Sequence, residues 1–160
     1  MRSERSIDVA AAPELVFRLA RDVSRWSELL PHYRRSRAIR RRDDGALLIE
    51  FVARRELPLP GLGVDVAWRA WTWSEPDSCR LRFVHVGGAT AGMDVTWRIE
   101  PRGRGARVTI EHDFAAPVVW ATFVDRFFTR HVAGRTLAAF RSIAEAVDES
   151  GAAAAAKYPT

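Results

Sequence analysis

Along most of the first 114 residues, apolar and polar side chains alternate at the two-residue period of a strand with one buried face. Short groups rich in Gly, Pro, Asp and Ser interrupt the alternation, which is typical of tight turns between antiparallel strands. Such consecutive hairpins predict one curved antiparallel sheet of about seven strands. The predicted strands span residues 5–10, 34–41, 46–56, 64–73, 80–86, 93–100 and 106–114.

Between the first two predicted strands, apolar residues recur every three or four positions instead of every two. This spacing predicts a helix over 13–22, which Pro13 can open because the first helical turn needs no backbone N–H. A second short helix is predicted over 24–30, where Pro31 stops it. Two short helices therefore separate the first strand from the second.

A long helical region is predicted near the C-terminus, from Pro117 to about Ser150. With the sheet it predicts an α+β fold, in which the sheet wraps round the long helix and leaves a cavity between them. We expect a single domain over 1–150 and a flexible tail over 151–160. The expected buried face of the helical region comprises Phe123, Phe127, Val132, Thr136, Ala139, Phe140, Ile143 and Val147.

The composition is that of an ordinary globular protein. With 160 residues, of which 48% are hydrophobic, the chain can bury a core without disulfides or structural metals. Its only cysteine, Cys79, excludes an internal disulfide and favours a cytoplasmic protein. No stretch reaches the roughly 18 apolar residues of a membrane-spanning helix, and the N-terminus lacks the apolar core of a signal peptide.

The net charge is +5, and a cluster of arginines falls within residues 34–42. Such a cluster could bind nucleic acid or an acidic partner, or it could be the solvated face of a strand. We favour the solvated strand and predict no nucleic-acid partner, because neither a recognition helix nor a stacking platform accompanies the arginines. The pattern does not separate a monomer from a homodimer.

Motifs of several enzyme classes are missing from the sequence. It has neither the phosphate-binding glycine loop of nucleotide enzymes nor the Gly-x-Ser-x-Gly turn of hydrolases. No two of the four histidines stand four residues apart, the spacing at which a helix holds a metal. We therefore predict neither a metal nor a cofactor.

Alternation places two histidines, His85 and His112, on otherwise apolar strand faces. Each could be a buried histidine with an ordinary hydrogen-bond partner. Together they could instead exchange protons with a ligand in the cavity, because imidazole titrates near neutrality. Tyr33 could donate a hydrogen bond to a carbonyl or enolate oxygen. Flat cavity walls are expected from three tryptophans, Trp26, Trp68 and Trp97.

Four segments carry a resemblance to a known family, which extends over about residues 5–148. They read SIDVAAAPELVF (6–17), DVSRWSELLP (22–31), WRIEP (97–101) and VTIEHDF (108–114). The chain is similar to the START-like superfamily, also called Bet v 1-like or polyketide cyclase/dehydrase and lipid-transport proteins. The resemblance implies a helix-grip fold with a hydrophobic cavity. It does not imply a single function, because the superfamily includes both cyclases and carriers.

Within that superfamily the sequence looks most like the bacterial polyketide aromatase/cyclases, which hold a poly-β-ketone and direct ring closure and dehydration. Trp26 and Tyr33 resemble a pocket tryptophan and tyrosine of those enzymes, and Trp97 resembles a pocket tryptophan of a later strand. The resemblance implies that His112 is the general acid/base, while His85 and Tyr33 orient or polarise carbonyl groups. It also implies ligand contacts from Trp26, Trp68, Thr72, Trp97, Phe127 and His131.

One run departs from the aromatase pattern. Those enzymes carry an aromatic-x-Ser-x-Arg run on a central strand, where this chain has Trp68-x-Ala70-x-Thr72. A second family arginine corresponds to His85, and Arg69 lies on the opposite face by parity. Two hypotheses therefore stay open. The chain could be a cyclase that receives a hydrophobic polyketide from an acyl carrier protein, or a non-catalytic carrier of a quinone, lipid or fatty acyl chain.

Overall fold

The computed structural model describes residues 2–56, 62–114 and 132–157, the last six of them for the backbone alone. Within these ranges seven strands form one antiparallel sheet in the order β1-β7-β6-β5-β4-β3-β2. The sheet was predicted as antiparallel and about seven-stranded, and both features are confirmed. The strands are β1 (Arg2–Val9), β2 (Tyr33–Arg41), β3 (Leu47–Glu56), β4 (Gly63–Glu75), β5 (Arg80–Gly88), β6 (Met93–Arg102) and β7 (Gly105–Phe114).

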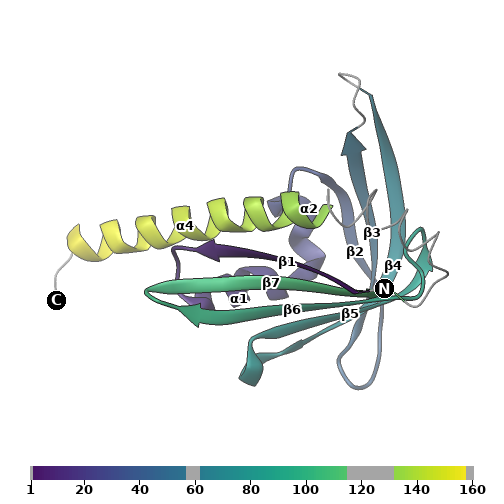
Figure 1. Ribbon diagram of the computed structural model, residues 1–160, viewed down its shortest axis with the longest axis horizontal. Helices are drawn as coiled ribbons and strands as arrows, with labels where there is room; N and C mark the ends of the chain where they lie inside the picture. Colours follow the sequence, from purple (N-terminus) through teal and green to yellow (C-terminus); the bar gives the residue numbers. More distant parts are fainter. Residues whose placement is uncertain (1, 57–61, 115–131, 158–160) are drawn as a thin grey trace.

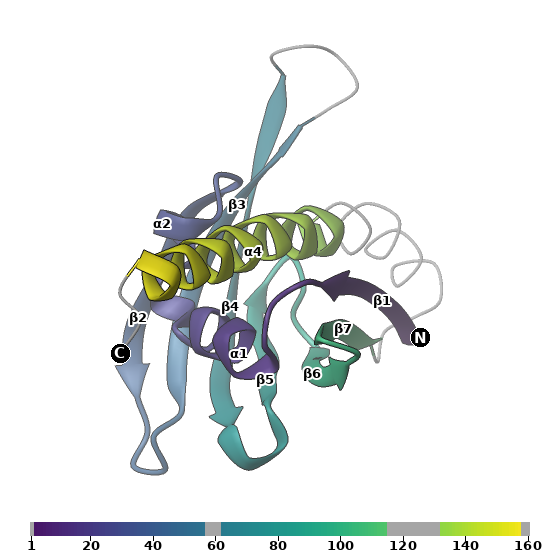
Figure 2. The ribbon, with the colours of Figure 1, turned by 90° about the vertical axis from the view of Figure 1, so that its left-hand side faces the viewer.

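The helices lie on one side of this sheet, which curves round them (Figures 1 and 2). The long helix α4 (Gly134–Lys157) lies across the concave side, with α1 and α2 near it, whereas η2 forms part of the turn between β4 and β5. This arrangement confirms the predicted α+β helix-grip fold. The shorter helical elements are α1 (Pro13–Arg21), η1 (Val23–Arg25), α2 (Trp26–Leu29) and η2 (Pro76–Ser78), of which η1 and η2 are single 3₁₀ turns.

The described part of the C-terminal helix differs from the predicted one at its end. Helix α4 continues to Lys157, so the predicted end near Ser150 is too early. The run of alanines from 152 to 156 explains the difference, because alanine has the highest helix propensity. The predicted beginning of the helical region at Pro117, together with Phe123, Phe127 and His131, lies outside the described residues.

The concave face of the sheet and the facing side of α4 form the hydrophobic core. On β5, β6 and β7 every residue that strand alternation turns inward is buried. These residues are Leu81, Phe83, His85, Met93, Val95, Trp97, Ile99, Val108, Ile110, His112 and Phe114. Two apolar residues depart from the predicted faces. Alternation turns Val64 of β4 inward, but it is 47% exposed, because this end of β4 extends beyond the cover of the helices (Figure 2). Val147 of α4 was expected on the buried face of the helix, but it is 43% exposed and borders a surface hollow beside α1.

Two side-chain contacts hold edge strand β2 against the helices and so position the residues before it. The Ser36 hydroxyl is 2.7 Å from the Val23 carbonyl oxygen and 2.8 Å from that of Ser24. The indole N–H of Trp26 donates to the Ala20 carbonyl oxygen at 3.0 Å. These bonds connect α1, η1 and β2, and they fix Trp26 beneath the start of β2.

A bulge in β5 determines where His85 points. The register passes from Arg69 opposite Gly87 to Ala70 opposite His85, so Val86 has no partner on β4 and lies exposed. Gly88 follows with a φ of +83°, and a Cβ there would lie 2.3 Å from the Ala67 carbonyl oxygen. Only glycine fits this approach, which keeps the end of β5 close to β4 and His85 on the inner face.

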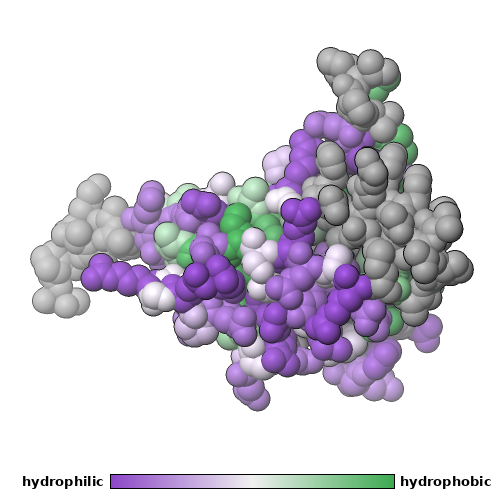
Figure 3. Space-filling model, viewed as in Figure 1, coloured by the Kyte–Doolittle hydropathy of each residue, from purple (hydrophilic) through white to green (hydrophobic). Residues whose placement is uncertain are grey.

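The arginines from 34 to 41 lie on the edge strand β2, as expected for a solvated strand, and Arg42 follows its end. Arg35 and Arg37 both reach Glu50 of β3, at 3.1 and 3.7 Å. The face in Figure 3 is mostly hydrophilic, while apolar residues gather over the middle of α4. None of the helices in the described ranges is long and apolar enough to cross a membrane.

Candidate functional site

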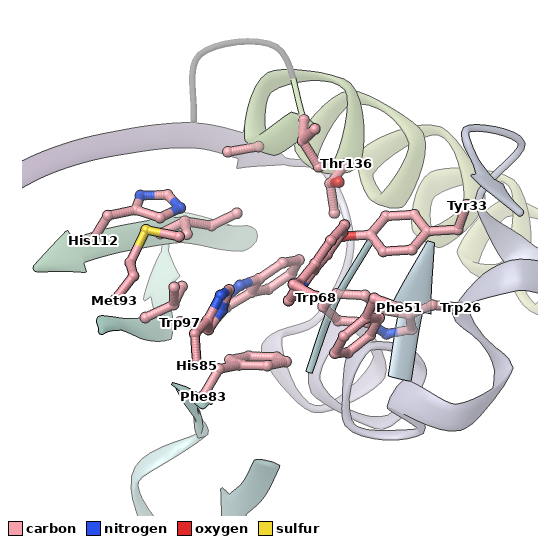
Figure 4. A pocket seen from close by; sticks show the side chains of 14 residues that line it. Trp26, Tyr33, Phe51, Trp68, Phe83, His85, Met93, Trp97, His112 and Thr136 are labelled. Carbon is pink, nitrogen blue, oxygen red and sulfur yellow. The ribbon is translucent and has the colours of Figure 1, made fainter. Parts of the chain in front are cut away.

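The described residues enclose a cavity between the concave face of the sheet and the first turns of α4 (Figure 4). The volume in it that the centre of a water-sized molecule can occupy is about 50 Å³. Pockets for drug-sized ligands measure roughly 300–1,000 Å³, so this cavity is narrow. Its lining combines aromatic, aliphatic and a few polar side chains: Trp26, Tyr33, Phe51, Trp68, Phe83, His85, Met93, Val95, Trp97, Ile110, His112, Val132, Ala133 and Thr136.

Trp26 is the centre of the aromatic end of the cavity. Its ring centroid lies 5.1 Å from that of Trp97 and 5.6 Å from those of Tyr33 and Phe140. Such tilted and edge-on contacts contribute to stability beyond the burial of area. Because the Trp26 N–H already donates to Ala20, this side chain offers a ligand only its apolar surface.

His85 is held from two sides. Its Nδ1 lies 2.5 Å from the Thr90 hydroxyl oxygen, and its ring stacks on Trp68 at 6.3 Å between centroids with a 10° interplanar angle. Burial, and secondarily the charge of His112, lower the pKa of His85 to about 3. The imidazole is therefore neutral at neutral pH, and one of its nitrogens is a donor while the other is an acceptor.

His112 reaches the same cavity from β7. It is 7% exposed, lies opposite Val95 of β6 and appears beside Met93 in Figure 4. A positive charge on His112 makes protonation of His85 less favourable, so the two imidazoles interact electrostatically. Strand alternation predicted that both histidines face the cavity, and both line it.

Tyr33 and Thr136 bring hydroxyl groups to the opposite wall. Both line the cavity, where Thr136 lies close enough to Tyr33 to act on the pKa of its hydroxyl. Burial raises the pKa of Tyr33 well above its usual value, and Thr136 offsets part of that rise. The Thr136 hydroxyl also lies 2.9 Å from Nε2 of His32, a buried residue behind the wall.

Of the nine site residues that the sequence predicts, six line the cavity and one does not. Thr72 is buried on the inner face of β4, but its hydroxyl donates to the Leu47 carbonyl oxygen at 3.2 Å and it is absent from the lining. Arg69 points to the outer face and bonds to Glu50. Phe127 and His131 lie outside the described residues. The six lining residues are Trp26, Tyr33, Trp68, His85, Trp97 and His112.

Sequence reasoning missed the polar partners of these residues. Thr90 lies in a glycine-rich turn, and no sequence pattern connects it to His85 five positions earlier. His32 precedes Tyr33 by one residue, so strict alternation would turn it away from the interior. Thr136 was expected on the buried face of the helix, but only the fold brings it between Tyr33 and His32.

The described lining contains no charged arginine, lysine or carboxylate side chain. Within the described ranges, no three His, Cys, Asp or Glu side chains converge as a metal site would require. Besides the indole N–H groups of its tryptophans, the polar groups of the described lining are two imidazoles and the hydroxyls of Tyr33 and Thr136. Such groups can donate to carbonyl oxygens and exchange protons with them.

Solved structures with the same fold include aromatase/cyclases. The ZhuI aromatase/cyclase from a Streptomyces species has a TM-score of 0.72 at 17% identity, covering 91% of this chain and 93% of that one. The protein TTHA0849 from Thermus thermophilus has a TM-score of 0.71 at 20% identity, covering 92% and 99%. The di-domain aromatase/cyclase StfQ from the steffimycin pathway has a TM-score of 0.68 at 18% identity, covering 92% and 46%.

No curated protein matches this chain. The model of the family described as "Polyketide cyclase / dehydrase and lipid transport" matches residues 1–147. This match covers all seven strands and the first half of α4, so it includes every described wall of the cavity. The chain therefore belongs to the polyketide cyclase/dehydrase and lipid transport family.

Proposed function

We propose that this chain is a polyketide cyclase, which binds a poly-β-ketone or an aromatic intermediate derived from it and directs ring closure and dehydration. The observation that carries the proposal is the convergence of His85, His112 and the Tyr33 hydroxyl on one cavity with otherwise mainly apolar walls. An aldol closure needs a group that removes a proton from carbon and groups that stabilise the developing enolate oxygen. These three side chains are of the types that can do so.

The three polar residues differ in the role that suits them. His85 is a poor base because its pKa is about 3, but its neutral ring can donate to a carbonyl oxygen from Nε2 while Nδ1 accepts from Thr90. We assign it to carbonyl polarisation. His112 is assigned the acid/base role in enolisation and dehydration, and Tyr33 donates to a second carbonyl oxygen.

The narrowness of the cavity adds a condition to this proposal. A space of about 50 Å³ does not hold a polyketide chain, so ligand binding requires the walls to separate. Much of the described wall is aromatic, and ring planes present flat surfaces to a planar product. The proposal therefore includes a ligand-bound form with a wider cavity.

The alternative is a non-catalytic carrier of a quinone, lipid or fatty acyl chain. A specific observation favours it, because the described lining has no charged side chain that would anchor a poly-ketone. Thr72, where the aromatases carry an arginine, bonds to the Leu47 carbonyl instead of facing the cavity. A carrier would hold its ligand without turnover and would tolerate replacement of both histidines.

We also propose that an acyl carrier protein delivers the substrate to the cyclase. A surface cleft behind the Tyr33 wall is bordered by Arg34, Arg54 and Arg135, with Glu56 as its acidic member. Two of these arginines are partly neutralised, since Arg135 lies 3.0 Å from Glu56 and Arg54 lies 3.9 Å from Asp65. The remaining positive charge suits a negatively charged carrier.

The experiment supplies the protein to minimal polyketide synthases that make several chain lengths, and it compares products with and without the protein by mass spectrometry and NMR. A shift to one regiospecifically closed, dehydrated ring is the expected result. An unchanged product mixture at every chain length would contradict the cyclase and direct attention to co-purified ligand, which native mass spectrometry detects.

The role of His112 is tested with H112Q, which keeps a polar side chain of similar length but cannot exchange a proton at neutral pH. We expect cyclisation to fall about 10²-fold or more, the usual contribution of a general acid/base. Circular dichroism and thermal unfolding of H112Q provide the folding control. Wild-type activity in a folded H112Q protein would rule out the assigned role.

A further inference from the structure

His32 lies between two hollows of the molecule. It is 8% exposed, and its backbone carbonyl accepts the N–H of Arg54 at 2.8 Å, which fixes it at the start of β2. On one side its ring borders the surface cleft formed with Arg34, Arg54 and Arg135. On the other side its Nε2 lies 2.9 Å from the Thr136 hydroxyl oxygen, which belongs to the wall of the cavity.

Thr136 continues this connection inward. It lies in the first turn of α4, is 1% exposed, is hydrogen-bonded to His32, and lines the cavity together with Tyr33, whose pKa it lowers. Figure 4 shows the oxygen atoms of Tyr33 and Thr136 on the same side of the cavity. The bond between His32 and Thr136 therefore connects the surface cleft to the cavity, at the point where Tyr33 also lines it.

Each of these three residues can both accept and donate a proton. Burial, and secondarily the charge of Arg135, lower the pKa of His32 to about 4, so its imidazole is neutral at neutral pH. A neutral imidazole has one N–H and one acceptor nitrogen, and each hydroxyl has a donor and acceptor sites. A threonine in a helix could satisfy its hydroxyl on a backbone carbonyl one turn earlier, so its bond to a histidine is a specific arrangement.

We propose that His32, Thr136 and Tyr33 form a proton path from the surface cleft to the cavity, with His32 as its solvent-side positioning residue. The inference rests on the proposed function, because it needs an oxygen-bearing ligand beside Tyr33. It explains why three polar side chains are aligned through an otherwise apolar wall, and it gives His32 a function that burial alone does not require.

The path operates in the dehydration step as follows. As the C–H electron pair forms the C=C bond and the C–O bond breaks, His112 takes the carbon proton and Tyr33 gives its hydroxyl proton to the departing oxygen, which leaves as water. Tyr33 takes the Thr136 proton, and Thr136 takes the proton from Nε2 of His32. Water in the cleft protonates Nδ1 of His32 and becomes hydroxide, which the carbon proton neutralises when His112 releases it to solvent. Exchange of the ring protons of His32 with water then restores the Nε2–H tautomer for the next cycle.

The first test compares T136V, which keeps the shape but removes the hydroxyl, with T136S, which keeps the hydroxyl. We expect T136V to lower the rate of product formation by about 10²-fold with little change in KM, because the proton supply and not the ligand contact is lost. Rescue by T136S would support the path. Equal losses in T136V and T136S, or a loss confined to KM, would overturn it.

A second test removes the solvent-side residue. H32A should lose product formation to a similar extent, and added imidazole should restore it by occupying the vacated space. A purely structural role of His32 predicts a lower unfolding temperature but no recovery with imidazole. The absence of recovery in a folded H32A protein would therefore contradict the path.

A third measurement does not depend on activity. The ¹⁵N NMR shifts of the His32 ring in the wild-type protein distinguish its tautomers, and the path predicts a proton on Nε2 that T136V perturbs. A proton on Nδ1 would reverse the direction of the bonds and overturn proton delivery to the cavity. If wild-type protein forms no cyclised product, the proposed function fails, and this tautomer still decides whether the bonds run inward.

Discussion

One face of strand β4 belongs to the interior of this protein and the other to its exterior, and the residues of the two faces are close neighbours in the sequence. On the inner face Trp68 is 4% exposed and stacks between Phe51 and His85. On the outer face Trp71 is half-buried beneath the guanidinium of Arg42, which lies 5.2 Å from its ring centroid. Arg69, between the two tryptophans, reaches Glu50 across the outer surface.

This contrast shows that residue type does not determine the role of a side chain here. Both faces carry tryptophans and titratable groups, but the inner groups are desolvated and the outer ones are paired in water. Desolvation lowers the pKa of His85 to about 3, whereas the outer carboxyl of Glu50 has a lowered pKa chiefly because Arg35 donates to it. Chemistry that requires a dry site is therefore confined to the inner face.

The largest expected effect that tests this contrast comes from replacing the tryptophans of β4 one at a time. W68A should lower the free energy of unfolding by about 3–5 kcal/mol, because a large buried ring is lost and a cavity remains. W71A should cost less than half as much, since the exterior ring loses mainly its contact with Arg42. Urea unfolding of both variants measures the difference, and equal losses would contradict the assignment of faces.

Alternation and turn residues were sufficient to predict the sheet, because they report only which face of a strand is buried. The same reasoning correctly turned His85 and His112 inward. It failed at Val64, since alternation does not say how far a strand extends beyond its cover. It correctly turned Thr72 inward as well, but Thr72 is absent from the cavity lining, because an inward threonine can satisfy its hydroxyl on a neighbouring backbone carbonyl.

The polar partners in the site were beyond the reach of sequence reasoning for a different reason. Thr136 meets His32 across 104 positions of the chain, and their contact depends on how α4 docks beside β2. Thr90 meets His85 because of the bulge at Val86 and the positive φ of Gly88. Such contacts follow from tertiary geometry, which periodicity does not encode.

A smaller expected effect concerns the pH dependence of stability and separates desolvated from solvated groups. The pKa of His85 is about 3 in the folded protein and near the ordinary histidine value of 6.5 when unfolded, so between these values only the unfolded chain binds the proton. The free energy of unfolding should therefore have its full value with respect to His85 above pH 6.5. Below pH 6.5 it should fall, by at most about 1.4 kcal/mol per pH unit from this group.

The variant H85Q should remove that contribution and flatten the stability curve between pH 5 and 6.5. Denaturant unfolding at several pH values measures the slope. H32Q is the matched comparison, since His32 also has a lowered pKa, of about 4, but lies nearer the surface. Its removal should flatten the curve in the same direction by a smaller amount. Identical slopes in wild-type protein and H85Q would mean that His85 is not desolvated.

The smallest expected effect belongs to the outer face, where Glu50 lies within 4.0 Å of three arginines of β2 and β4. E50Q keeps the shape of the side chain but leaves Arg35, Arg37 and Arg69 without their common counter-charge. Stability should fall slightly at low salt and recover at 1 M salt, where the Debye length is only about 3 Å. The loss in W68A should not recover in this way, because it arises from packing and not from charge. A loss in E50Q that is as large as that in W68A, or that is unchanged by salt, would mean that the outer carboxyl is desolvated and that the two faces differ less than their exposure indicates.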